Sequence, residues 1–243
     1  FQKKKGFSSK QMKETFAEIT RSFAEILCDR QPKIKVGIVG EIYVKYAALG
    51  NNNLEQFLYE QDCEVMLMGL LDFLLYCLQN NLEDYRLYGG SKLKYKVIQI
   101  ALTYLSNIKD NINATLKAFG FCAPSSFQHL TTLADGVIER GCKMGEGWLL
   151  TAEMMELIEL GYENIICVQP FGCLTNHIVG KGMIRTIKNQ QPLSNIVPID
   201  YDSGATKVNQ ENRIKLMLAV AKERQALQLP DKKTIEINLQ IPQ

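Results

Sequence analysis

The 243-residue sequence has little net charge, no long uninterrupted apolar run and no paired set of cysteines. A net charge of +2, with 28 scattered basic residues, does not provide the basic surface that a phosphate backbone requires, so we expect no nucleic-acid partner. The longest apolar run, residues 69–78, is broken by Asp72 and is far shorter than the roughly 20 residues of a membrane span. We therefore also expect no membrane partner.

The seven cysteines are odd in number and scattered, and no secretory signal is visible. Disulfide-stabilised secreted domains have compact, even-numbered cysteine frameworks, so this pattern predicts a reducing, cytoplasmic location. Cys28, Cys63 and Cys77 lie in apolar surroundings that are typical of core residues. Cys122 and Cys142 lie in apparent loops, where either could join a site.

Short apolar runs alternate with helical patterns over most of the chain. The runs at residues 34–42, 63–69, 164–170 and 195–202 are rich in β-branched residues, and most of the intervening segments have helical periodicity. This alternation predicts an α/β fold with a parallel Rossmann-like or flavodoxin-like sheet. Three consecutive helical segments between about residues 70 and 140 predict a helical insertion in that fold.

The domain organisation follows from the same pattern. Residues 1–32 are expected to form a helix that leads from a missing lobe, because the sequence begins with Phe1 and not with Met. Residues 33–228 are expected to form the α/β lobe, and residues 229–243 a C-terminal tail that is either a linker or an added edge strand.

Polar residues follow the first and the last predicted strands. Ligands of open parallel sheets bind at the carboxyl ends of the strands, so these positions are candidates for a site. Glu41 follows the first strand, where it either faces a cleft or caps a neighbouring helix. The glycines there do not form a G-x-G-x-x-G motif, which argues against a dinucleotide. Asp200 and Asp202 follow the last strand, where they either bind a ligand or form a turn and helix cap.

A glycine-rich segment, GEGWLL, opens the helix that precedes the third strand. Glu146 lies between two glycines, and the free N–H groups of such a helix start, at Gly147, can hold an anion. A glutamate in the first turn is also common without a ligand, since it complements the helix dipole. Trp148 could line a ligand, but a large aromatic residue near a helix start is more often part of the core.

The segment CVQPFGCLTNH, residues 167–177, contains the most specific chemistry. Cys167 lies inside an apolar strand and is expected to be an inert core thiol, whereas Cys173 follows Gly172 in a strand-to-helix loop that can surround a thiolate with N–H groups. His177 lies one helical turn later and could share a site with Cys173. These spacings do not match a zinc pattern. Cys173 can therefore be a ligand, a nucleophile with His177 as its base, or a structural residue.

Three strings carry a resemblance: KVGIVGEIYVKYAALGNNNLEQFL, GEGWLLTAEMMELIELGYENIICVQPFGCLTNHIVGKGMI and NIVPIDYDSGATKVNQENRIKLML. Together they resemble the large-activase relatives of the 2-hydroxyacyl-CoA dehydratase family, which are related to the activator of 2-hydroxyglutaryl-CoA dehydratase. The resemblance covers about residues 33–222 and identifies the chain as similar to a C-terminal lobe. Thr175 stands where the family pattern has proline.

The resemblance implies two Rossmann-like lobes that hold an iron-sulfur cluster of the 4Fe-4S type between them. It also implies an ATP-binding activator module that supplies low-potential electrons for the dehydration of a 2-hydroxyacyl-CoA. The cysteine of the family's QPFGC motif corresponds to Cys173, the candidate metal ligand, and the other ligands are expected in the missing N-terminal lobe. The alternative is a non-catalytic lobe that binds acyl-CoA or docks a subunit, with Cys173 structural. The candidate cofactor-binding residues are Glu41, Glu146, Gly147, Gly172, His177, Asp200 and Asp202.

Overall fold

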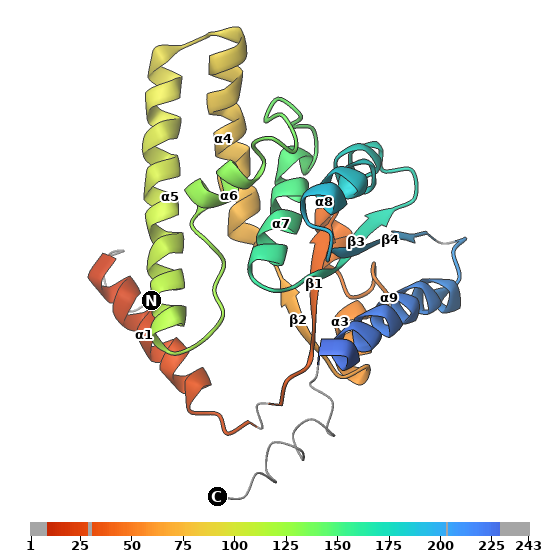
Figure 1. The fold of residues 1–243 in the computed structure, drawn as a ribbon. Helices are drawn as coiled ribbons and strands as arrows, with labels where there is room; N and C mark the ends of the chain where they lie inside the picture. Colours follow the sequence, from red (N-terminus) through yellow and green to blue (C-terminus); the bar gives the residue numbers. More distant parts are fainter. Residues whose placement is uncertain (1–8, 29–30, 203, 229–243) are drawn as a thin grey trace, which may run out of the picture.

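The computed structural model describes residues 9–28, 31–202 and 204–228, so the predicted tail lies outside the described residues. These residues form a four-stranded parallel sheet in the order β2-β1-β3-β4, flanked by helices (Figure 1). The fold is mixed α/β of the Rossmann-like or flavodoxin-like kind, as the sequence predicts. The strands are β1 (Ile34–Gly40), β2 (Cys63–Leu67), β3 (Asn164–Pro170) and β4 (Asn195–Tyr201).

Helices cover both faces of the sheet. Helices α3 (Leu54–Glu60) and α9 (Lys207–Gln228) pack on one face, and α7 (Gly147–Glu159) and α8 (Ile184–Gln190) pack on the other (Figure 1). From Val36 onward the side chains of β1 are buried on both faces, with Val36 and Ile38 in one layer and Val39 in the other. This explains the nearly continuous apolar runs in the sequence, since each large aliphatic side chain contributes about 1.5–3 kcal/mol when it is buried.

The strand order places a topological switch point between β1 and β3. The chain leaves β1 for β2 on one side, whereas β3 pairs with β1 on the other. Gly40 ends β1 at a φ of 140°, and a Cβ at this position would overlap the carbonyl group of Val168. The amide of Glu41 donates to the same Val168 oxygen at 2.9 Å, so the two strand ends meet through backbone atoms. Open α/β sheets bind their ligands in the crevice at such a point.

The predicted insertion corresponds to α4 (Leu70–Tyr88), α5 (Lys92–Ala118) and α6 (Phe127–Leu133), which lie between β2 and β3. Helices α4 and α5 form an antiparallel hairpin that projects away from the sheet (Figure 1). A cluster that includes Leu75, Tyr76 and Trp148 packs α4 and α6 against α7. Trp148 is completely buried, which confirms it as a core residue. The N-terminal helix α1 (Ser9–Ala24) packs on α5.

Two segments differ from the helices that their sequence predicts. Residues 176–189 do not form one helix but a π-helical turn (Asn176–Gly180), a 3-10 turn (Lys181–Met183) and then α8. Gly180 packs against Leu150 and the Cys167 sulfur, where a Cβ would lie 3.0 Å from each, so close packing overrides a regular helix here. The third helical segment that the sequence predicts between about residues 70 and 140 forms a helix over only the seven residues of α6.

Candidate functional site

The three predicted strand ends lie together at one edge of the sheet. Because all four strands are parallel, Glu41 after β1, Cys173 after β3 and Asp200 near the end of β4 share the carboxyl edge. Gln169 and Asp200 are register partners in β3 and β4. The sequence alone predicts this gathering, because it follows from strand direction.

Cys173 lies in the turn that connects β3 to the following helix. Gly172 adopts a φ of 74°, a left-handed conformation that turns the chain out of the strand. The Cys173 amide then donates to the Pro170 carbonyl at 3.2 Å, and Asn176 Nδ2 donates to the Cys173 sulfur at 3.3 Å. Cys173 as a residue is partly exposed.

His177 is held by the backbone and by Gln169. Its Nδ1 lies 3.2 Å from Gln169 Nε2 and 3.0 Å from the carbonyl oxygen of Cys173. Gln169, which is completely buried, also donates from Nε2 to Asp200 Oδ1 at 2.5 Å. In the tautomer without a proton on Nδ1, the ring accepts from Gln169 and is joined to Asp200 through this amide, and in the other tautomer Nδ1 donates to the Cys173 carbonyl. Among the hydrogen bonds of the described residues, none joins the His177 ring to the Cys173 sulfur, so the structure gives no support to His177 as the base of a thiol nucleophile.

Two carboxylates converge on the start of α2 (Ile42–Tyr46), directly after the switch point. Glu41 is the N-cap of this helix, and its Oε2 accepts from the Val44 amide at 2.8 Å. Of the two roles expected for Glu41, facing a cleft or capping a helix, the structure has the second, and the helix that Glu41 caps is the one that it begins. Glu146 is buried and its Oε1 accepts from the Ile42 amide at 3.0 Å. Glu146 therefore stabilises a helix 104 positions away in the sequence, which periodicity could not reveal.

Gly147 has a packing role. It adopts a φ of 46°, and a Cβ here would overlap the Tyr76 hydroxyl and the Cys142 carbonyl oxygen. The Gly147 amide donates to the Met144 carbonyl at 3.0 Å, and the Trp148 amide donates to the Cys142 carbonyl at 2.7 Å. The protein's own loop thus occupies these N–H groups, so the helix start that the sequence offers as an anion site is closed by backbone contacts.

Asp200 and Asp202 border a recess of about 320 Å³ at the end of β4. Phe171, from the Cys173 turn, and Arg213, from α9, line the same recess. A guanidinium beside two carboxylates and an exposed aromatic ring can orient a polar ligand that carries its own anionic group. The sequence predicts the two aspartates here, but not Arg213 as their neighbour, because α9 is brought to this edge by its packing on β3 and β4.

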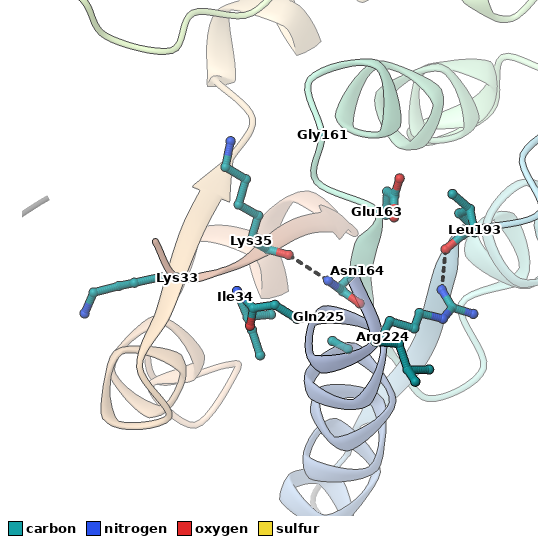
Figure 2. Close-up of a pocket in the computed structure, with 11 residues that line it drawn as sticks. Lys33, Ile34, Lys35, Gly161, Glu163, Asn164, Leu193, Arg224 and Gln225 are labelled. Atoms are coloured by element: carbon teal, nitrogen blue, oxygen red, sulfur yellow. Dashed lines mark hydrogen bonds between the residues drawn. The ribbon is translucent and has the colours of Figure 1, made fainter. Parts of the chain in front are cut away.

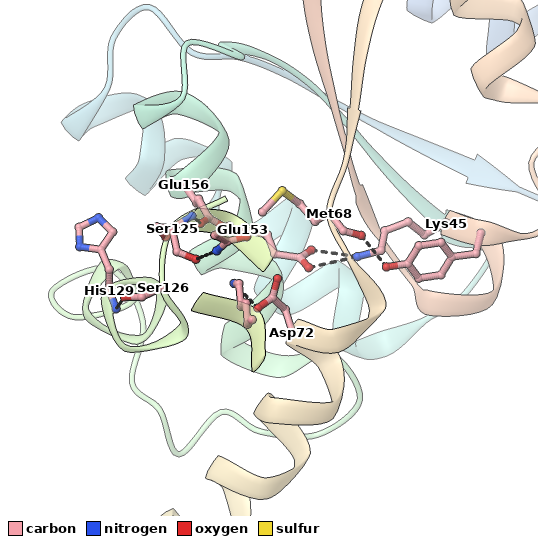
Figure 3. A network of polar contacts seen from close by, with 11 residues as sticks. Lys45, Met68, Asp72, Ser125, Ser126, His129, Glu153 and Glu156 are labelled. Atoms are coloured by element: carbon pink, nitrogen blue, oxygen red, sulfur yellow. Dashed lines mark hydrogen bonds and ion pairs between the residues drawn. The ribbon is translucent and has the colours of Figure 1, made fainter. Parts of the chain in front are cut away.

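A buried ionic network lies between the sheet and the insertion (Figure 3). Lys45 Nζ lies 3.1 and 3.2 Å from the two Glu153 carboxylate oxygens, with both side chains almost completely buried. Burial raises the pKa of the Glu153 carboxyl to about 7, against the lowering effect of the Lys45 charge. The pair links α2 to α7. Sequence reasoning missed it because Lys45 looks like a residue of an exposed turn.

The insertion is tied to the same network. Lys109 of α5 forms a buried ion pair with Asp72 of α4, the residue labelled in Figure 3. Glu156 of α7 accepts from the Ser125 amide at 2.6 Å, which fixes the loop that follows α5. Burial raises the pKa of both the Asp72 and the Glu156 carboxyl groups. The network thus links α2, whose start borders the switch point, to the helices of the insertion.

A second recess, of about 400 Å³, lies at the opposite, amino edge of the sheet (Figure 2). Lys35, Asn164 and Arg224 are among its lining residues. Asn164 Nδ2 donates to the Lys35 carbonyl at 3.0 Å, and Arg224 Nη1 donates to the Leu193 carbonyl at 2.6 Å (Figure 2). These polar groups are used to hold the chain itself. The recess therefore has volume without a converging set of reactive groups.

The remaining cysteines divide by exposure. Cys167 is completely buried and burial raises the pKa of its thiol to about 12, which confirms it as an inert core residue. Cys63 is also buried, as expected. The same expectation is wrong for Cys28 and Cys77, which are exposed because one follows the end of α1 and the other lies on the outer side of α4. Across residues 9–28, 31–202 and 204–228, no three His, Cys, Asp or Glu side chains are placed to hold a metal ion together.

Comparison of the chain with protein-family models, with curated proteins and with solved structures finds no match. Among the described helices, none is long and apolar enough to cross a membrane. The fold is thus an α/β domain with a parallel sheet, a switch point between β1 and β3, and the partly exposed thiol of Cys173 at the carboxyl edge.

Proposed function

We propose that the chain is one lobe of an iron-sulfur protein of the 2-hydroxyacyl-CoA dehydratase and activase family, in which Cys173 is a ligand of a shared cluster. The observation that carries this proposal is the position of Cys173, a partly exposed thiol in a hydrogen-bonded turn at the carboxyl end of β3. The resemblance of the surrounding segment to the family's QPFGC motif adds the identity of the ligand.

The donor set of the described residues fits one corner of such a cluster. A cluster of this type takes four thiolates, and Cys173 is the thiol at this turn. With no three candidate ligands grouped in the described part of the chain, the remaining thiolates would come from a second lobe. A partly exposed cysteine at the carboxyl edge suits a ligand that must reach across an interface.

The residues around Cys173 have distinct parts in this proposal. Asn176 donates an N–H to the sulfur, and hydrogen bonds of this kind stabilise a thiolate and raise the reduction potential of a bound cluster. Gln169 and His177 hold the turn in place through the Asp200 carboxylate and the Cys173 carbonyl. A bound cluster would supply one-electron transfer at low potential, with an ATP-binding activator module as donor and a 2-hydroxyacyl-CoA as substrate.

Anaerobic reconstitution with iron and sulfide, applied to the longest natural polypeptide that contains this chain, tests the proposal. We expect a charge-transfer absorption and bound iron, both lost with Cys173→Ser. Cys77→Ser is the matched control, since Cys77 is an exposed thiol that belongs to α4 and not to the Cys173 turn, and it should leave the iron content unchanged. Equal iron in the wild-type protein and in Cys173→Ser would refute the assignment.

A second candidate function is a lobe that binds acyl-CoA or docks a subunit, with Cys173 structural. The recess at the end of β4 favours it, because Arg213 lies there beside Phe171 and can pair with a phosphate or carboxylate. Titration calorimetry with coenzyme A separates the two candidates. This function predicts that Arg213→Gln weakens binding about tenfold, the loss of roughly 1.4 kcal/mol, while Cys173→Ser changes neither binding nor iron content.

A further inference from the structure

Helix α5 has two apolar stripes on different sides. One stripe, which includes Tyr95, Leu102 and Leu105, faces the hairpin partner α4 and the adjoining core. The Tyr95 and Tyr85 rings have centroids 4.7 Å apart. The second stripe points away from this contact and is exposed. Its residues and exposed fractions are Leu93 (73%), Val97 (57%), Ile100 (71%) and Tyr104 (55%).

The spacing of the exposed stripe is that of a coiled-coil seam. Its residues follow one another at intervals of four, three and four, which is the alternation of the a and d positions of a heptad. The solvent face of a helix in a globular protein is normally polar, so a second apolar seam indicates a second partner. Asn107 and Asn111 occupy the next two positions of the pattern and end the apolar part. The seam therefore spans roughly 17 Å of helix, at about 1.5 Å per residue.

The location of the seam leaves it open to another chain. The α4–α5 hairpin projects from the sheet, and α1 runs beside the end of α5 that is distant from the hairpin turn (Figure 1). Consistent with this, the Arg21 guanidinium of α1 lies 6.0 Å from the Phe119 ring, just beyond the C-terminus of α5. The seam begins at the other end of the helix, at Leu93. A shallow groove of about 420 Å³ runs beside Ile100 and Tyr104.

The charges that flank the seam select among partners. Lys94 and Lys96 lie on opposite flanks of the seam, at the positions that form ion pairs across a coiled coil. The first turn of α5 contains no acidic residue. A parallel second copy would place Lys96 opposite Ala101 and Lys94 opposite Gly89, and an antiparallel copy would place the two lysines near Ala101 and Thr103. Neither arrangement supplies a carboxylate, whereas a helix with flanking glutamates would pair with both lysines.

We propose that the seam formed by Leu93, Val97, Ile100 and Tyr104 docks an amphipathic helix of a partner protein, with apolar residues in heptad spacing and acidic residues beside them. The apolar groups provide the contact area, and Lys94 and Lys96 select the sign of the partner's charge. The inference rests on α5 alone, so it stands or falls independently of Cys173.

Two blocked synthetic peptides of equal length test the proposal against the full chain, measured by fluorescence anisotropy. Both have leucine at the a and d positions, and the flanking positions are all glutamate in one and all lysine in the other. We expect the glutamate peptide to bind at least about tenfold more tightly, a difference of roughly 1.4 kcal/mol, and to lose affinity as salt is added. Lys94→Glu with Lys96→Glu should reverse the preference.

Matched variants connect binding to the seam. Val97→Glu with Ile100→Glu should abolish binding without lowering the melting temperature by more than a few degrees, because both side chains are exposed. Arg185→Glu with Lys188→Glu, the same charge change on exposed positions of α8, should leave the preference unchanged. Equal binding of the two peptides, or binding of neither, would overturn the proposal. So would a concentration-dependent dimer of the chain that Val97→Glu dissociates, because the seam would then be a contact between copies.

Discussion

Replacement of Lys45 by methionine should be among the most destabilising single substitutions outside the apolar core. Lys45 Nζ lies 3.1 Å from Glu153 Oε1, and the side chains are 6% and 3% exposed. At that distance and an effective dielectric constant of about 20, the attraction is roughly 5 kcal/mol. Removal of one partner from a buried pair costs about 3–5 kcal/mol. We expect Lys45→Met to lower the free energy of unfolding by about 3–5 kcal/mol at pH 8.

The loss should depend on pH in a defined direction. The pKa of Glu153 is raised from 4.5 to about 7 in the folded protein. Between these two values the folded state binds more protons than the unfolded state, so the contribution of Glu153 to stability falls as the pH rises from 4.5 to 7. Each pH unit within this window is worth about 1.4 kcal/mol. At a pH of about 5.5 the carboxyl is largely neutral, and Lys45→Met should then cost clearly less than at pH 8.

Urea unfolding followed by the fluorescence of Trp148, the single tryptophan, measures both effects. The control is Lys207→Met, because Lys207 forms an exposed pair with Glu211 at 3.6 Å and should contribute less than about 1 kcal/mol at either pH. Lys45→Met combined with Glu153→Leu should recover most of the loss, since a packed apolar pair can replace a buried ion pair. An equal loss at both pH values, or one no larger than that of Lys207→Met, would refute the reasoning.

Two further predictions concern the backbone at the switch point and the thiols. Gly40→Ala should lower the free energy of unfolding in urea by about 3 kcal/mol or more, because the new Cβ would overlap the Val168 carbonyl at a residue with positive φ. Gly161→Ala is the control: its φ is 82° but the space around it is open, so the loss should be only about 1–2 kcal/mol. Similar losses of unfolding free energy for the two variants would contradict the close contact between Gly40 and the Val168 carbonyl. In iodoacetamide mapping by mass spectrometry, the five thiols that are exposed or partly exposed should react in the native protein, and Cys63 and Cys167 only after unfolding. Rapid native labelling of Cys167 would contradict its burial.

Local sequence patterns were sufficient to locate the strands, the direction of the sheet and the edge at which polar groups gather. Strands that are buried on both faces read as β-branched apolar runs, and parallel strands place the residues after them at one edge. Cys167 could be assigned to the core and Cys173 to the turn because one lies within such a run and the other follows its end. These inferences needed only local pattern and strand direction.

Tertiary structure decided which residues are partners. Glu146 caps α2 across 104 positions, and Lys45 pairs with Glu153 across 108, because packing of α7 on the sheet brings these segments together. Periodicity shows which face of an element is apolar but not which distant element covers it. For the same reason the sequence misassigned Cys77, since an apolar helix context does not say which side of α4 is covered. The physical reason is that burial and ion pairing depend on neighbours in space, which the order of residues along one helix does not specify.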